Sequence, residues 1–299
     1  MSKLRSAIKI LRKQGFLQLV SSTLAHIHNR LTERKQQPGY LSAIVFRILV
    51  IWHMIQTLIQ DRYLIIPSKE NWVTYKIPEF EKIACIPSPL DSNHGTPQHK
   101  NQLSSVHQLE GFVELDEGDT VFDVGAYIGT YSILAAETAE TVISIDPYAS
   151  INSCLTENTA EYGNIEVLPI ACWNTTTTLE LNLSKTPNEN SILDTDNFDL
   201  GKKAKVDADT ISNIAKNRGY KKIDFMKLEG EGVEPEILEG AIQDDVIVEK
   251  ISIDCSAERN GHAPTDEIVE ILESNGYEYK IKTTPVWNVD IVYAVKDNF

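Results

Sequence analysis

The stretch from Val121 to Glu137 constrains the fold of this chain more than any other. It begins with the apolar run Val121–Val124, turns through Gly125 and Gly129, and continues into Ser132–Glu137, which has helical composition and apolar spacing. This order predicts a strand, a tight turn and a helix. The turn then presents backbone N–H groups at the carboxyl end of a parallel strand, where open α/β sheets bind ligands. We expect both glycines to let a ligand approach the backbone closely, because neither has a Cβ atom.

The spacing of this turn narrows the choice of ligand. From Asp123 to Gly129 it is D-x-G-x-x-x-G, whereas a loop that holds the pyrophosphate of a dinucleotide is usually G-x-G-x-x-G. The turn therefore favours a ligand without a pyrophosphate, and S-adenosylmethionine is such a ligand. Plain strand-to-helix turns also contain glycines, so the rest of the chain must decide between these interpretations.

Composition and charge exclude several classes of protein. The 299 residues suffice for one large α/β domain with an extension or for two small domains, and 42% hydrophobic with 24% charged residues excludes a wholly disordered chain. The net charge of −15 is uneven, since residues 1–36 carry +7 and the remainder carries −22. An acidic body repels phosphates, so we expect no nucleic-acid partner.

The cysteines indicate a reducing compartment. Cys85, Cys154, Cys172 and Cys255 are far apart and form no C-x-x-C motif, which is typical of small buried hydrophobic residues rather than of a zinc site. We expect no metal. No apolar core with a small-residue cleavage site follows the basic first residues, so we predict a cytoplasmic protein.

Residues 1–62 are predicted to form a helical extension. Residues 1–36 place Lys and Arg between apolar positions at helical spacing, a pattern that suits an anionic membrane surface or a solvated helix packed on its own domain. Residues 41–59 are apolar at 14 of 19 positions, but Arg47, His53 and Thr57 interrupt them. Because most of the polar positions share one side of a helical wheel, we expect a half-buried amphipathic helix rather than a membrane span. Peripheral attachment through residues 1–60 to the cytoplasmic leaflet stays open beside a helix that covers the main domain or a dimer interface.

Residues 63–109 are predicted to contain short strands and a linker. The strands are expected at Tyr63–Ile66, Trp72–Ile77 and Ile83–Ile86, and residues 87–105 have the Pro-, Ser- and Asn-rich composition of a loop or linker. Three histidines, His94, His99 and His107, lie in or beside it. Their irregular spacing and polar setting favour solvated histidines over metal ligands.

Strands and helices alternate in residues 110–299. We predict parallel strands at Val121–Val124, Val142–Asp146, Ile165–Cys172, Ile223–Leu228 and Lys250–Cys255, helices at about 130–138, 150–162, 210–217, 235–241 and 265–274, and a short β insertion at Thr175–Leu183. This alternation predicts a doubly wound parallel sheet. The last two strands, Tyr277–Lys282 and Val289–Val295, are joined by a short turn and should pair antiparallel. A seven-stranded, mostly parallel sheet with an antiparallel last strand is the α/β, Rossmann-like arrangement of class I S-adenosylmethionine-dependent methyltransferases.

Two acids follow or lie within the first strands. Asp146 ends the second predicted strand, 21 residues after Gly125, where a carboxylate can accept hydrogen bonds from both ribose hydroxyls of an adenosine. The alternative is a turn-forming Asp before Pro147. Asp123 is an acid in an apolar strand, so it should hold the N–H groups of the loop or the ammonium group of the ligand, or else anchor the loop.

A second dense motif follows the fourth predicted strand. Lys227, Glu229, Glu231 and Glu234 lie at or just past its end, beside the expected cleft, where acids can bind acceptor hydroxyls, take up a proton or hold a cation. The alternative is a charged rim in water.

Two further groups of candidates lie at or past strand ends. Asp254, Glu258 and His262 are at or past the end of the fifth predicted strand, and Cys172 and Trp173 are at or past the end of the third. His262, which follows Asp254 and Glu258, is a candidate proton acceptor, although most loop histidines are merely solvated. Cys172 and Trp173 either flank an adenine or belong to the core.

Together, these motifs resemble the FkbM family of methyltransferases. The family motif V-x-D-V-G-A-N-I-G-x-Y-S corresponds to Val121–Ser132, D-F-I-K-I-D-V-E-G-A-E corresponds to Asp224–Glu234, and Ile145-Asp146-Pro147 matches an acid-proline pair. The similarity runs from about Glu110 to the C-terminus. Among the departures from the family pattern, Tyr127 replaces Asn, Glu229 replaces Asp, and Gly230 replaces Val.

The resemblance implies methyl transfer from S-adenosylmethionine to oxygen, with a hydroxyl of a sugar, glycan, glycolipid or small natural product as acceptor. The motifs and the strand ends together give these cofactor-binding candidates: Asp123, Gly125, Ala126, Tyr127, Gly129, Tyr131, Ser132, Asp146, Pro147, Cys172 and Glu229. The catalytic candidates are Lys227, Glu231, Glu234 and His262, and one of the last three should be the general base.

Two other functions stay open at this point. A nicotinamide-dependent oxidoreductase has the same sheet, but this chain has no G-x-G-x-x-G motif. A catalytically silent methyltransferase-like scaffold, whose N-terminal helices bind a membrane or a partner, is compatible with Tyr127 in place of Asn. The sequence does not name the acceptor, because loops such as 184–205 build acceptor pockets.

Overall fold

The computed structural model describes residues 47–48, 50–55, 57–68, 71–184, 190–193, 202–243, 245–259, 261–285 and 288–296. The chain forms two compact units, Met1–Ser92 and Asn93–Phe299, which we call the N-terminal and the C-terminal unit. The basic helix that we predicted within residues 1–36 lies outside the described residues.

The N-terminal unit contains a helix and a small antiparallel sheet. Residues 47–48 and 50–55 are helical, and a π-helical segment, η1 (Thr57–Asp61), follows. The strands β1 (Tyr63–Ser68), β2 (Asn71–Lys76) and β3 (Glu81–Ile86) lie close to the predicted ranges and pair in chain order. The short 3-10 helix η2 (Pro89–Asp91) comes next. In the part of the chain that the structure describes, no helix is long and apolar enough to cross a membrane.

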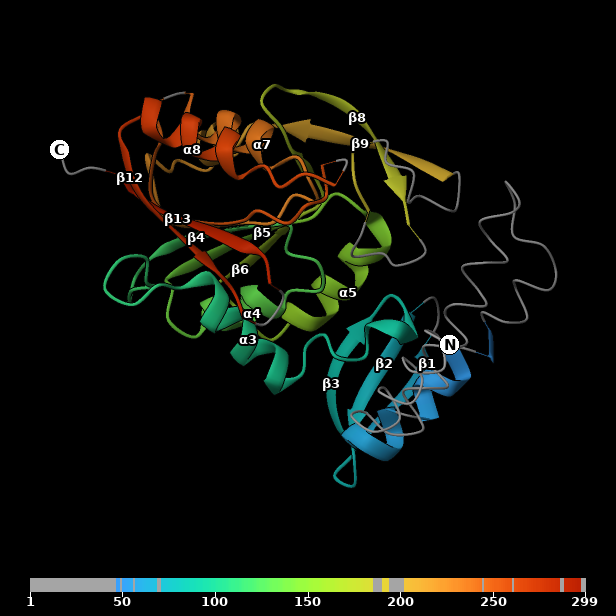
Figure 1. The fold of residues 1–299 in the computed structure, drawn as a ribbon. Helices are drawn as coiled ribbons and strands as arrows, with labels where there is room; N and C mark the ends of the chain where they lie inside the picture. Colours follow the sequence, from blue (N-terminus) through green and yellow to red (C-terminus); the bar gives the residue numbers. More distant parts are fainter. Residues whose placement is uncertain are drawn as a thin grey trace, which may run out of the picture. The chain divides into compact units, whose positions relative to one another are not determined.

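A seven-stranded sheet forms the centre of the C-terminal unit (Figure 1). Its strands, in chain order, are β4 (Thr120–Val124), β5 (Thr141–Ile145), β6 (Ile165–Leu168), β10 (Lys222–Leu228), β11 (Ile247–Asp254), β12 (Tyr277–Thr283) and β13 (Asp290–Lys296). In space the order is β12-β13-β11-β10-β4-β5-β6. β13 is antiparallel to both β11 and β12, while β11, β10, β4, β5 and β6 are parallel. This confirms the class I methyltransferase arrangement.

Helices cover both faces of this sheet, because its strands carry apolar side chains on both sides. On one face, α3 (Pro97–His107) and α4 (Thr130–Ala136) pack with Val121 and Phe225. On the other face, α6 (Ile211–Asn217), α7 (Glu234–Ile242) and α8 (Thr265–Ser274) pack with Phe122 and Met226. The remaining helix, α5 (Ala149–Thr159), joins β5 to β6. Figure 1 shows α3 and α4 on the side of the sheet opposite to α7 and α8.

Two parts of the C-terminal unit differ from the sequence prediction. The segment predicted as a loop or linker contains α3, and the predicted strand Ile165–Cys172 is divided between β6 and β7 (Ala171–Cys172). β7 belongs to a second sheet of order β7-β9-β8, in which β8 (Thr177–Leu183) is the predicted insertion and β9 (Lys202–Asp209) was not predicted. β9 buries only Val206 and Ala208 between exposed polar residues, so its apolar signal is weak.

Candidate active site

A cleft of about 720 Å³ opens at the carboxyl ends of the central strands of the C-terminal unit. Many of the predicted site residues line it: Gly125, Ala126, Tyr127, Tyr131, Asp146, Pro147, Cys172, Lys227, Glu229, Glu231 and Glu234. Four others, Asp123, Gly129, Ser132 and His262, are not among its lining residues. The loops after β4, β5, β10 and β11 and the helix α3 all contribute side chains, so residues far apart in the sequence meet here.

The glycines of the first turn are required by packing. Gly125 has a φ of +72°, and a Cβ atom there would lie 1.9 Å from the backbone oxygen of Glu229. Gly129 has a φ of +86°, and its Cβ would lie 2.7 Å from Leu155 Cδ1 and 3.0 Å from Thr159 Cγ2. The loops after β4 and β10 therefore touch backbone to backbone, and α5 packs directly on Gly129. Close approach of a ligand, the reason that we expected for both glycines, remains open for Gly125, which lines the cleft.

Tyr127 holds an unusual backbone conformation between these two glycines. Its φ is +51°, a left-handed conformation in which Asn is far more common than an aromatic residue. Its ring lies edge-on to His94, with 5.1 Å between the ring centroids. The Asn of the family pattern suits this backbone better than the Tyr of this chain.

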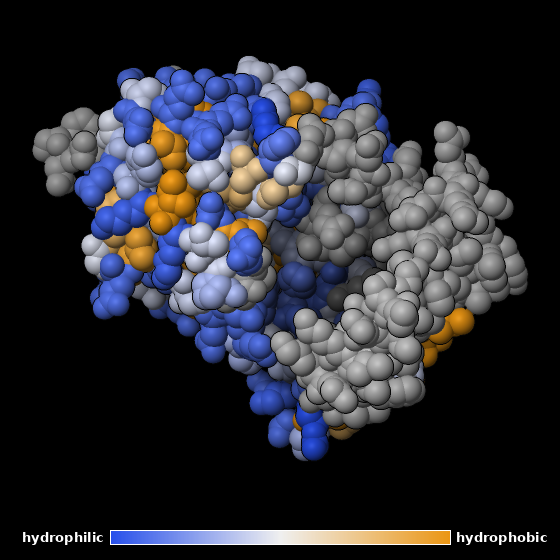
Figure 2. Space-filling view, viewed as in Figure 1, coloured by the Kyte–Doolittle hydropathy of each residue, from blue (hydrophilic) through white to orange (hydrophobic). Residues whose placement is uncertain are grey.

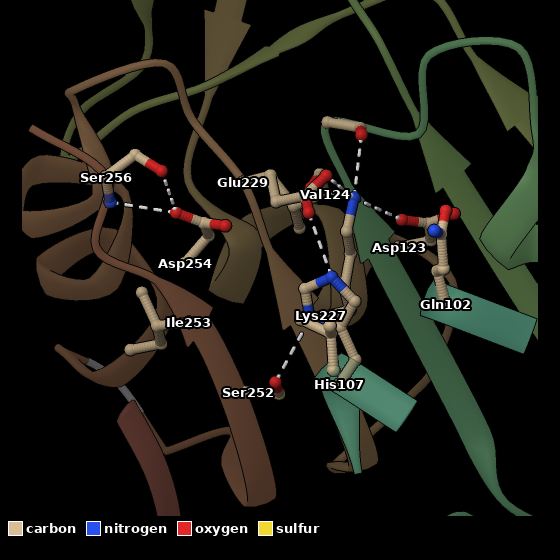
Figure 3. A network of polar contacts seen from close by, with 12 residues as sticks. Gln102, His107, Asp123, Val124, Lys227, Glu229, Ser252, Ile253, Asp254 and Ser256 are labelled. Atoms are coloured by element: carbon tan, nitrogen blue, oxygen red, sulfur yellow. Dashed lines mark hydrogen bonds and ion pairs between the residues drawn. The ribbon is translucent and has the colours of Figure 1, made fainter. Parts of the chain in front are cut away.

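A buried network of charges lies beneath the cleft (Figure 3). Lys227 Nζ lies 2.8 Å from Glu229 Oε2 and 3.2 Å from Asp123 Oδ1, and it donates to the carbonyl oxygen of Gly125 at 2.8 Å. Ser132 Oγ donates to the other oxygen of Asp123 at 2.6 Å. Burial alone would lower the pKa of Lys227, but the two carboxylates raise it above its ordinary value. Lys227 therefore stays protonated and fixes the turn after β4.

His107 joins this network from α3. Its Nε2 lies 2.9 Å from Glu229 Oε1 and its Nδ1 lies 3.1 Å from Ser252 Oγ on β11, while its side chain is fully buried. Burial would raise the pKa of Glu229, but Lys227 and His107 hold it below its usual range. Our prediction of a solvated His107 is wrong. The only sequence signal was its position at the end of a possible helix.

Asp146 lies at the carboxyl end of β5, as predicted, and is nearly buried. Burial raises the pKa of its carboxyl group to about 7, against hydrogen bonds donated by the backbone N–H groups of Tyr148 and Tyr127. The Tyr148 N–H lies 3.0 Å from Asp146 Oδ1. The side chain thus closes the turn before α5, and it also lines the cleft; hydrogen bonds from ribose hydroxyls to this carboxylate stay a prediction.

Glu234 is a buried carboxyl group on the other side of β4. Its Oε1 accepts hydrogen bonds from the N–H groups of Gly230, at 2.7 Å, and Gly232, at 3.2 Å, whereas its Oε2 has no hydrogen-bond partner among the described residues. Burial raises its pKa to about 7, opposed by those N–H groups and supported by the charge of Asp254. A lining carboxyl group with a free oxygen and a near-neutral pKa suits proton transfer.

Asp254 approaches the same region from the end of β11. Ser256 donates both its N–H and its hydroxyl to Asp254 Oδ1, at 2.8 and 2.5 Å. Burial and the nearby charge of Glu229 raise the pKa of Asp254. In Figure 3 its second oxygen carries no drawn contact.

Two more lining side chains have buried polar atoms without a hydrogen-bond partner in the described part of the chain. These atoms are the hydroxyl oxygen of Tyr131 and Nδ1 of His99. Burial lowers the pKa of His99 to about 4, aided by His94, so its ring is neutral at physiological pH. Unpartnered buried polar atoms are costly in a folded protein unless a ligand or water pairs with them, so these two mark the α3 side of the cleft as a binding surface.

The other predicted residues have plainer environments. His262 is exposed and lies outside the lining of the cleft, so we leave it out of the site. Cys172 is buried in the wall, where burial raises the pKa of its thiol, and Trp173 packs against the core. Within the described residues, no group of three His, Cys, Asp or Glu side chains is arranged to hold a metal ion.

Comparisons with known proteins bear on the same unit. The sequence pattern of the methyltransferase FkbM domain matches residues 123–279, more than half of the chain. No curated protein sequence matches it. Among solved structures the chain is similar to a methyltransferase FkbM from Methylobacillus flagellatus KT, with 18% identity and a TM-score of 0.45, over 69% of this chain and 52% of that one. The chain thus spans about half the length of that structure.

The chain is also similar, at lower TM-scores, to two other solved structures. One is a fibrillarin pre-rRNA processing protein from Methanococcus jannaschii, with 15% identity and a TM-score of 0.43, over 79% of this chain and 89% of that one. The other is a magnesium protoporphyrin IX methyltransferase from Synechocystis PCC 6803 with bound S-adenosylmethionine, with 14% identity and a TM-score of 0.40, over 67% and 79%.

Proposed function

Because the chain belongs to the FkbM methyltransferase family, we propose that it transfers a methyl group from S-adenosylmethionine to a hydroxyl group of a sugar, glycan or glycolipid. The observation that carries this proposal is the composition of the cleft. Asp146 and the Gly125–Tyr127 turn lie on one side of β4, and the buried carboxyl group of Glu234 lies on the other. One side suits a nucleoside, and the other suits a hydroxyl that must lose a proton.

The residues of the first side fit the cofactor. Asp146 lies at the end of the second parallel strand, where a carboxylate accepts hydrogen bonds from the two ribose hydroxyls. The free hydroxyl of Tyr131 and the neutral ring of His99 offer hydrogen bonds to the polar amino-acid end. A volume of about 720 Å³ is ample for one cofactor and a small acceptor. When bound, the cofactor supplies a methyl group already activated by a positively charged sulfur.

Glu234 is the general base of this proposal. Its Oε2 has no hydrogen-bond partner among the described residues, so an acceptor hydroxyl can donate to it and then transfer its proton. Asp254 offers a second acceptor oxygen for a neighbouring hydroxyl. Lys227 and Glu229 hold the floor of the cleft and position the turn after β4, since each is tied into the buried network.

The cofactor part of the proposal is tested by calorimetry on an Asp146→Ala variant. We expect S-adenosylmethionine binding to be lost, while Asp266→Ala, an exposed acid in the first turn of α8, binds like the natural protein. Unchanged binding by Asp146→Ala, with unchanged thermal stability, would contradict the assignment of the ribose site.

The acceptor part needs a separate experiment. The full chain is incubated with methyl-labelled S-adenosylmethionine and a cell extract that is then divided into lipid, glycan and protein fractions. We expect the label in the glycan or lipid fraction, in a linkage that resists mild base as an ether does. Label in protein alone would overturn the choice of acceptor and leave the cofactor site standing.

A further inference from the structure

Exposed apolar side chains gather on the N-terminal unit. Seven large hydrophobic residues are exposed in the described part of the chain, and six of them belong to this smaller unit. The face of the C-terminal unit shown in Figure 2 is mostly hydrophilic, with scattered apolar residues. An uneven distribution of this kind marks a surface that meets something other than water.

Four of the six residues form one stripe along the helix. Ile48, Ile51, Ile55 and Leu58 are 47%, 59%, 40% and 36% exposed. Their spacing of three, four and three residues places them on one side of a helix. We call these four residues the apolar stripe.

The opposite side of the same helix is polar and faces inward. His53 Nε2 lies 2.9 Å from Ser92 Oγ, Thr57 donates to the carbonyl oxygen of His53 at 2.9 Å, and Thr57 and Ser92 are buried. The helix is thus half-buried, as the sequence predicted, and its exposed side carries the apolar stripe. The polar groups are satisfied inside the unit, so the apolar stripe has no role in its core.

The net charge of the N-terminal unit indicates which kind of partner would bind the apolar stripe. Residues 1–92 contain thirteen Lys and Arg against six Asp and Glu, a net charge of +7, whereas residues 93–299 carry −22. The whole excess of positive charge lies in residues 1–36, which are outside the described residues. Two exposed arginines, Arg47 and Arg62, come just before and shortly after the stripe in the sequence. Proteins that bind anionic lipid surfaces often place long basic side chains beside apolar residues. The apolar groups enter the acyl boundary, and the cations contact the headgroups.

We propose that the N-terminal unit binds an anionic lipid surface through the apolar stripe, with its basic residues on the headgroups. A second copy docked stripe to stripe is the weaker partner, because two N-terminal units that each carry +7 would repel one another. Such binding would bring the protein to acceptors held at a membrane. It is a property of the N-terminal unit alone, so the vesicle experiment tests it whatever the acceptor is.

Sedimentation of the full chain with vesicles tests the proposal. We expect it to bind vesicles of phosphatidylcholine and phosphatidylglycerol at least about tenfold more strongly than vesicles of phosphatidylcholine alone, and to lose much of this binding as salt rises. The variant Ile51→Glu should lose at least about tenfold in vesicle binding. Its matched control is Ile281→Glu, because Ile281 is 46% exposed on the C-terminal unit, and this variant should bind as before.

Three results would overturn the proposal. The first is that Ile51→Glu and Ile281→Glu lose vesicle binding equally, and the second is that vesicle binding does not depend on the content of anionic lipid. The third is that the chain binds no vesicles but forms a dimer in sedimentation equilibrium, and that this dimer depends on the apolar stripe. If Ile51→Glu does not fold, as judged by thermal unfolding, the double variant Arg12→Glu and Lys13→Glu leaves the stripe untouched. That variant must then weaken binding to the anionic vesicles for the proposal to hold.

Discussion

Glu229 shows how one side-chain length connects two parts of the site. In the family pattern this position is Asp, and here the longer carboxylate reaches both Lys227 and His107. His107 lies on α3, before residues 123–279 that match the family. Glu in place of Asp at position 229 therefore ties the second motif to α3, a helix that lies outside that motif.

The proton acceptor gives the first prediction at the residue scale. With the cofactor saturating, the rate should rise with pH through about 7, because the ionised form of Glu234 accepts the proton and burial has raised its pKa to about 7. Glu234→Gln should lower the rate by about 10²–10⁴-fold and remove this rise. The pH profile of kcat is the measurement. Saturation excludes Asp146, whose pKa is also about 7 but whose proposed role is in binding.

An unchanged pH profile in Glu234→Gln would assign the base elsewhere. The same raised pKa also affects stability. Since the folded protein favours the neutral carboxyl, the contribution of Glu234 is fully present below its ordinary pKa and is lost as the pH rises through about 7.

Tyr127 gives the second residue-scale prediction. Its positive φ stores strain, and Asn adopts this conformation more readily, so Tyr127→Asn should stabilise the protein by about 1 kcal/mol and raise the melting temperature by about 2–4 °C. Thermal unfolding without ligand measures this. Tyr148→Asn is the control, because Tyr148 also lines the cleft but has an ordinary φ of −92°. Equal effects of the two substitutions would mean that lost ring contacts, and not backbone strain, decide the result.

At the scale of elements, α3 is the part that the sequence prediction missed. The sequence does mark the start of this helix with a threonine and a proline. In the structure the side chain of Thr96 accepts a hydrogen bond from the N–H of His99, and the proline lies in the first turn. Its composition is polar, with buried residues only at Leu103, Val106 and His107 near its end. So few apolar positions give little helical periodicity, and the polar composition therefore favoured a linker over a helix.

The cap of α3 provides a prediction with a matched control. Thr96→Ala and Thr210→Ala each remove a buried threonine that caps a helix, and each should cost about 1 kcal/mol of stability. Only Thr96→Ala should also weaken S-adenosylmethionine binding, because α3 carries His99 and His107 into the site. Thermal unfolding and calorimetry measure the two effects. Equal affinities in both variants would show that α3 does not shape the cofactor site.

The central strands and their helices were predictable because each has a strong local pattern. β4, β10 and β11 are rich in large apolar residues and are buried along most of their length. β9 was missed since its inward residues are the small Ala204 and Ala208 around Val206. Contacts such as His107 with Glu229 were beyond prediction, because they join residues 122 positions apart.

The whole molecule is divided by charge as well as by structure. The C-terminal unit carries a formal charge of −22, so its like charges repel and salt should screen them. We expect its melting temperature to rise as sodium chloride is added from low ionic strength, while binding to anionic vesicles falls. Thermal unfolding in a salt series measures the first effect. A melting temperature that falls over this range would show that its ion pairs outweigh the repulsion.

The position of β13 has a consequence for synthesis of the chain. This strand pairs with β11 on one side and with β12 on the other, yet it is synthesised after the other six strands of its sheet. Until Asp290–Lys296 has emerged, β12 has no neighbour and β11 keeps an open edge. The nascent sheet therefore has an exposed strand edge until β13 is made, and we expect a chaperone to be needed during this interval.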